Sequence, residues 1–84
     1  MFKVYYSTFV KDGIEAGKNT VIGRQEIRNM QINDRRMNKW EAARLIVSLY
    51  AGLAPCDIHV DAMQDINTGE VVFCDASKRN GGQR

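Results

Sequence analysis

Three side chains that could hold a metal ion or move a proton alternate along one short stretch of the chain: Asp57, His59 and Asp61. If this stretch is a strand, alternate residues leave the same face about 6.6 Å apart. Carboxylate oxygens suit hard divalent cations, and Asp75 could add another. Alternating acids are nevertheless common on exposed strands, and catalytic metal sites usually draw ligands from several elements. We therefore expect no metal and no cofactor.

The residue types of the chain also do not favour nucleophilic catalysis. A triad needs Ser or Cys, His and a carboxylate brought together, but the chain has a single His, His59. The two cysteines, Cys56 and Cys74, are predicted to point to the opposite side of their strands, and neither belongs to a CxxC pair that would indicate zinc. The sequence contains no G-x-x-x-x-G-K-[ST] phosphate loop. We expect a protein that is not an enzyme, with both thiols reduced.

The charged residues are unevenly distributed. Residues 55–76 contain five acids and neither Lys nor Arg. Met63 and Phe73 are predicted to pair on the same exposed strand face. An acidic surface can occupy a partner's basic, nucleic-acid-binding surface because carboxylates replace phosphates electrostatically. The sequence therefore predicts a protein-binding face formed by Asp57, Asp61, Met63, Asp65, Phe73 and Asp75.

Nucleic-acid binding is the alternative function. Residues 24–44 contain six bases against three acids, a composition that favours phosphate contacts. Tyr5, Phe9 and Phe73 could form a stacking platform on an exposed sheet face, as in sheet-type RNA binders. The acids expected on the same face would repel phosphate. The predicted nucleic-acid contacts are Arg24, Arg28, Arg35, Arg36, Lys39 and Arg44.

The elements that must position these residues begin with a strand. Phe2–Val10 is rich in aromatic and β-branched residues without helical spacing, and Asp12-Gly13 is a turn signal. A loop is expected from there to about residue 19. Residues 20–32 are predicted to form a second strand with a bulge near residues 23–28, where Ile27 is out of phase with Met30. A short helical turn is the alternative there.

One segment has a strong helix signal, Lys39–Ala51. Asn38 can cap its start with Glu41 reaching back, and Gly52 can end it in a left-handed conformation. Its apolar residues cover a wider arc than the ~100° stripe that one sheet face needs. Either loops of the chain or a second chain must cover the excess. We expect a homodimer or a partner bound to the helix, with Trp40, Val47 or Tyr50 at the contact.

Two further strands are predicted at residues 56–65 and 70–75, joined by a hairpin at Asn67-Thr68-Gly69. The expected register places Ala62 opposite Cys74 and Met63 opposite Phe73, unless a bulge at Gly69 shifts it. The predicted core comprises Leu45, Ile46, Leu49, Ile58, Val60 and Val72, with Cys56 and Cys74 beside them.

These elements predict an α+β fold with the order β-β-α-β-β. It is a four-stranded, mostly antiparallel sheet with one main helix packed on one face. The 84 residues, 44% hydrophobic and 26% charged, suit a single globular domain over residues 1–76, followed by a flexible basic tail at 77–84. The chain lacks an apolar run near the ~18–20 residues of a membrane span. It also begins without a signal-peptide pattern, so a cytoplasmic location is expected.

The preferred reading is a small non-enzymatic intracellular protein-interaction module whose partner has a basic surface. Small phage-encoded inhibitors of host defence complexes, including anti-CRISPR proteins, share this size and simplicity. The analogy concerns the type of protein alone, because no motif of the chain belongs to a family.

Overall fold

The computed structural model describes residues 1–74 of the chain. Strands β1 (Phe2–Val10) and β2 (Gly13–Ile22) lead into helices α1 (Arg24–Asn33) and α2 (Lys39–Ala51). A 3-10 turn, η1 (Pro55–Asp57), precedes β3 (Ile58–Asp65) and β4 (Val71–Phe73). The predicted tail at 77–84 and the predicted contact Asp75 lie outside the described residues.

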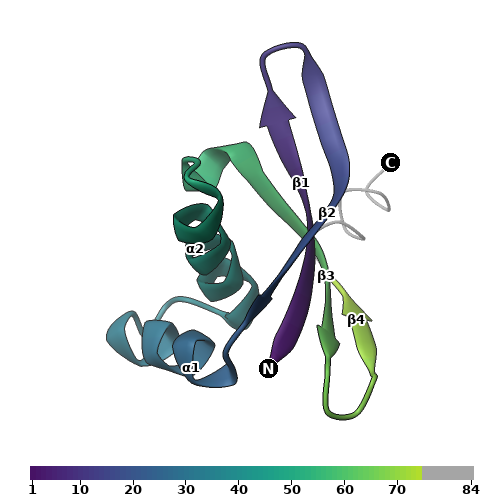
Figure 1. Ribbon diagram of the computed structural model, residues 1–84. Helices are drawn as coiled ribbons and strands as arrows, with labels where there is room; N and C mark the ends of the chain where they lie inside the picture. The colour runs from purple at the N-terminus through teal and green to yellow at the C-terminus, as the bar shows by residue number, and fades with distance from the viewer. Residues whose placement is uncertain (75–84) are drawn as a thin grey trace, which may run out of the picture.

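The four strands form one antiparallel sheet in the order β2-β1-β3-β4. Both helices lie on the same side of this sheet (Figure 1). The predicted α+β fold with a four-stranded antiparallel sheet is confirmed, with two helices where one main helix was expected. Among residues 1–74, no helix is long and apolar enough to span a membrane.

The segment predicted as a loop and a bulged strand is instead a strand followed by a helix. β2 pairs with β1 from Gly13, directly across a tight turn, so the loop expected up to residue 19 does not exist. Helix α1 begins where the Gly23 backbone N–H donates to Glu26 Oε2 at 2.7 Å. Ile27 and Met30, three residues apart, then both pack toward the core. The phase change that predicted a bulge was the start of helical periodicity.

Helix α2 has the predicted bounds. Asn38 Oδ1 accepts a hydrogen bond from the Glu41 backbone N–H at 2.9 Å, which caps the first turn. Gly52 ends the helix with φ +71°, a left-handed conformation in which glycine avoids the strain of a Cβ atom. Local signals at both ends therefore fixed this element.

The core lies between the sheet and the two helices. The predictions for Ile46, Ile58, Val60 and Cys74 are confirmed, because all four are buried. Leu45 is half-buried. The core also takes in residues from α1 and from the middle of α2 that the sequence did not place there: Ile27, Ala42, Ala43 and Val47.

Three core predictions are wrong, each for a local reason. Leu49 is 72% exposed because α2 turns Ala43 and Val47, not Leu49, toward the interior. Val72 is 40% exposed because it lies on the short edge strand β4. Cys56 is exposed because it belongs to η1 and precedes the strand that was expected to bury it.

Candidate interaction surfaces

A bulge in the centre of β3 reverses the expected alternation of its side chains. Tyr5 pairs with Ala62, but the next residue of β1, Tyr6, pairs with Val60, so Asp61 is the extra residue. Val60 and Met63 consequently both face the helices. Met63 is only 3% exposed and pairs with Val4 and Val72, so its predicted role in a binding surface is wrong.

The pairing of β3 with β4 also differs from the expected register. Ala62 lies opposite Phe73, one residue away from the predicted partner Cys74. Ala62, Phe73 and Tyr5 thus form one row across three strands, on the face that points away from the helices. We call this face, represented by Tyr5, Ser7, Asp61, Ala62 and Phe73, the outer face of the sheet.

The bulge separates the predicted acidic residues. Asp61 lies on the outer face, where it accepts a hydrogen bond from Ser7. Asp65 pairs with Phe2, a residue packed against the core, so Asp65 lies on the helix side of the sheet. Asp57 belongs to η1. These three acids do not share one face, and the continuous acidic surface expected from strict alternation is not formed.

Arg24, at the start of α1, forms an ion pair with Asp65. Arg24 Nη2 donates to Asp65 Oδ2, and the Arg24 guanidinium lies 4.6 Å from the centre of the Phe2 ring. The hydrogen bond from Arg24 keeps the pKa of Asp65 below its ordinary value. Arg24 and Asp65 therefore join helix α1 to the end of β3, and the Arg24 side chain is still 55% exposed.

The Arg24–Asp65 pair predicts a pH-dependent contribution to stability. Because the folded-state pKa of Asp65 lies below the ordinary value of 3.8, the contribution is complete above that pH. It is lost as the pH falls through the lower, folded-state pKa. Urea unfolding of the wild type and Asp65→Asn should therefore differ near pH 6 and converge in strong acid.

The control for this pair is Asp65→Asn made in an Arg24→Gln background. Without the guanidinium, replacing Asp65 should leave a much smaller difference near pH 6. An equal difference in both backgrounds would contradict a stabilising contact between these two side chains.

Ser7, Asp61 and His59 form a connected polar group on the outer face. Ser7 Oγ donates to Asp61 Oδ2 at 2.7 Å, and His59 Nδ1 lies 2.7 Å from Asp61 Oδ1. Asp61 therefore stands between the hydroxyl and the imidazole. In a serine nucleophile the hydroxyl is directed at the base instead, so this order of contacts does not activate Ser7.

The predicted nucleic-acid contacts lie on the helical side of the molecule. Arg24 is engaged with Asp65, as described above. The remaining five bases are exposed along α1, the connection to α2 and α2 itself: Arg28, Arg35, Arg36, Lys39 and Arg44. Tyr5 and Phe73 lie on the outer face. The bases and the aromatic platform of the nucleic-acid hypothesis are thus on opposite sides of the sheet.

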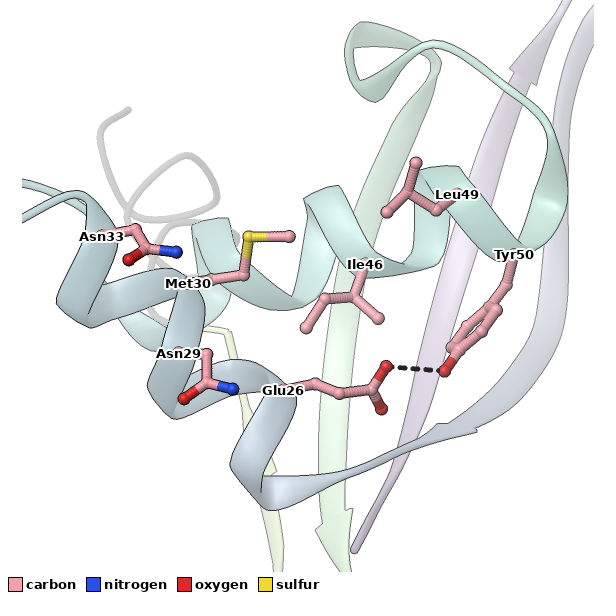
Figure 2. Close-up of a pocket in the computed structure, with 7 residues that line it drawn as sticks. All are labelled: Glu26, Asn29, Met30, Asn33, Ile46, Leu49 and Tyr50. Carbon is pink, nitrogen blue, oxygen red and sulfur yellow. Dashed lines mark hydrogen bonds between the residues drawn. The ribbon is translucent and has the colours of Figure 1, made fainter.

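A groove of about 230 Å³ runs between the two helices (Figure 2). Helix α1 provides a mostly polar wall and α2 a mostly apolar one. Leu49 and Tyr50, which are 72% and 55% exposed, stand on the α2 side. The lining residues are Glu26, Asn29, Met30 and Asn33 from α1, with Ile46, Leu49 and Tyr50 from α2.

Glu26 and Tyr50 bridge the groove at one end. The Tyr50 hydroxyl donates to Glu26 Oε1 at 2.8 Å, as the dashed line in Figure 2 marks. This hydrogen bond to Glu26 raises the pKa of Tyr50. Glu26 Oε2 accepts from the backbone N–H of Gly23, so one carboxylate both starts α1 and ties it to α2.

Sequence reasoning missed this groove because it requires α1. The available signals were the spacing of Gly23 and Glu26, which matches a capped helix start, and the three-residue step from Ile27 to Met30. Both signals were interpreted as a strand bulge, with a short helical turn as the alternative, and the structure has a ten-residue helix there.

The three residues predicted to form dimer contacts differ in their burial. Val47 is fully buried inside the monomer, so its assignment to a dimer interface is wrong. Trp40 is half-buried and packs against the core. Tyr50 is exposed beside the groove. Much of the wide apolar arc of α2 is therefore explained by contacts within the chain, including those with α1.

Comparisons with protein-family models, with curated proteins and with solved structures found no match. The function is accordingly inferred from the surfaces described above.

Proposed function

We propose that the protein is a non-enzymatic interaction module that holds an amphipathic, basic segment of another protein in the groove between α1 and α2. The observation that carries this proposal is the exposure of Leu49 and Tyr50 beside a groove that also contains a carboxylate. Removing a leucine side chain from water contributes about 1.5–3 kcal/mol. An exposed leucine at a concave site is therefore a good anchor for a partner.

The chemistry of the two walls defines the partner. Ile46, Leu49 and Met30 offer contacts to an apolar side chain. Glu26 is the charged residue among the seven that line the groove within residues 1–74, and it is exposed. A Lys or Arg on the partner segment can pair with it, while Asn29 and Asn33 can bond to polar groups. We therefore still propose a partner with a basic surface. In the groove it would pair with Glu26, and not with the acidic strand face predicted from the sequence.

A module of this kind would act inside the cell, where its two thiols remain reduced. If the basic segment is one that its owner uses to contact nucleic acid, occupying it would inhibit that owner. Binding in the groove would in this way account for the inhibitor function predicted in the sequence analysis.

The test uses Leu49→Glu and a matched control, Ile32→Glu. Both residues are exposed aliphatic side chains on helices, but Ile32 does not line the groove. Tagged protein should capture one identifiable protein from nuclease-treated lysate of the native host. We expect Leu49→Glu to reduce capture by at least 10-fold, on the order of a binding hot spot, and Ile32→Glu to leave it unchanged. Nuclease-sensitive capture, or capture unaffected by Leu49→Glu, would contradict the proposal.

Formation of a homodimer remains a prediction. Of the three residues predicted to contact the second copy, Tyr50 is the exposed one. A second copy would compete with the basic segment for the same groove. Light scattering distinguishes the two occupants. A dimer that Leu49→Glu dissociates would assign the groove to self-association and would overturn the proposed partner.

A further inference from the structure

The outer face of the sheet carries two aromatic rings in one row. Tyr5 of β1 pairs with Ala62 of β3, which pairs with Phe73 of β4, so all three side chains leave the same face. Phe73 is 64% exposed. The two aromatic residues are separated by two inter-strand spacings, about 9.5 Å, with a small residue between them.

Polar groups accompany the Tyr5 ring. Lys3 Nζ lies over the Tyr5 ring, 5.3 Å from its centre, and the Tyr5 hydroxyl donates to Gln64 Oε1 at 3.4 Å. This arrangement suits a nucleobase with its phosphate if the flexible Lys3 side chain moves from the ring face to the phosphate as the base stacks. The ring offers stacking and the ammonium offers charge. The Gln64 amide also donates to Gly69 O, and its second N–H and second oxygen lone pair can bond to a base edge.

The distribution of charge favours the same ligand. Residues 75–84 contain three bases, Lys78, Arg79 and Arg84, against one acid, which equals the net charge of +2 for the whole chain. Residues 1–74 are therefore neutral overall. The three bases follow β4, the strand that bears Phe73, beginning five residues later and after Asp75.

Among residues 1–74, fewer of the predicted acids lie on this face than strict strand alternation requires. Asp65 lies on the helix side with Arg24. Asp61 remains on the outer face, where one of its oxygens accepts from Ser7 and the other contacts His59, so one of the predicted acids still faces this surface. The main objection to nucleic-acid binding by this face came from strict strand alternation, which the bulge at Asp61 breaks.

We propose that the outer face binds single-stranded nucleic acid, with one base on Phe73 and another on Tyr5, and with Lys3 supplying part of the positive charge. A duplex keeps its bases stacked on one another and cannot present them to these rings. This proposal is independent of the groove, which lies on the helical side. The proposed binding residues also differ from the basic residues of 24–44 that the sequence predicted as nucleic-acid contacts.

Fluorescence anisotropy with labelled oligouridine, labelled oligothymidine and a labelled DNA duplex tests the proposal. We expect the full-length protein to bind one or both single strands more tightly than the duplex. The two single-stranded arms decide between RNA and DNA. Phe73→Ala should weaken single-strand binding by roughly 5- to 150-fold, the range measured for loss of one stacked base. Tyr5→Leu should act in the same direction.

Two controls make the experiment decisive. Ile32→Ala removes an exposed apolar side chain from the helical side and should leave binding unchanged, as should the pair Arg35→Gln and Arg36→Gln. Unfolding midpoints verify that each variant is folded; Phe73 is exposed, so its replacement should preserve the fold. Absence of single-strand binding, preference for the duplex, or unchanged binding by folded Phe73→Ala would each overturn the proposal. A dominant effect of the arginine pair would do the same.

Discussion

Ile46→Ala is expected to lower the free energy of unfolding by about 2–5 kcal/mol, the usual loss for a large aliphatic side chain in a core. Ile46 is 3% exposed and belongs to the central cluster. Leu49→Ala, three residues further along α2, is expected to change it by less than about 0.5 kcal/mol because that side chain remains in water. Urea denaturation of the two variants measures both values.

The comparison matters because sequence periodicity assigned both residues to the core. A large loss for Leu49→Ala would mean that Leu49 is covered in the folded chain. The groove between α1 and α2 would then be closed, and the proposed binding site would lose its anchor. The total stability of small domains is about 5–15 kcal/mol, so the Ile46 variant is best measured at low temperature.

Met63→Glu is expected to destabilise the fold by at least about 3 kcal/mol. The bulge at Asp61 turns Met63 into the core beside Val4, where a carboxylate has no partner to replace water. Gln64→Glu is the matched control, since the adjacent side chain bonds to Tyr5 and lies on the outer face. Its effect should be much smaller. Thermal unfolding followed by circular dichroism compares the two.

The opposite order of stabilities would contradict the bulge. If Gln64→Glu unfolded the protein and Met63→Glu did not, the strand would follow the strict alternation first inferred from its sequence. Asp61 and Asp65 would then share a face with Met63, and the acidic surface would be restored.

The elements that could be predicted are those whose signals are local. Helix α2 was defined by a capping side chain at Asn38 and a left-handed glycine at Gly52, both of which act within one turn. Helix α1 was missed because Gly23 offers no capping side chain, so Glu26 was the sole strong mark of its start. Propensity alone did not distinguish this short helix from a bulged strand.

The candidate sites were harder to predict because each depends on contacts between distant residues. At β3 the sequence alternates regularly up to Val60, but Ala62 and Met63 are both apolar, so either phase could face the core. Met63 pairs with the core residue Val4, and this pairing places Met63 on the core side of the sheet. The groove requires α1 to pack against α2, which no short stretch of sequence encodes. The aromatic row was predicted in part, since Tyr5, Phe9 and Phe73 were expected on one sheet face.

The most direct test of the proposed function is NMR mapping of isotope-labelled protein on addition of the captured partner. The groove predicts that the largest side-chain shift changes occur at Met30, Leu49 and Tyr50, with Phe73 unaffected. Changes concentrated at Tyr5 and Phe73, with the groove unchanged, would contradict it and move the partner to the opposite side of the sheet.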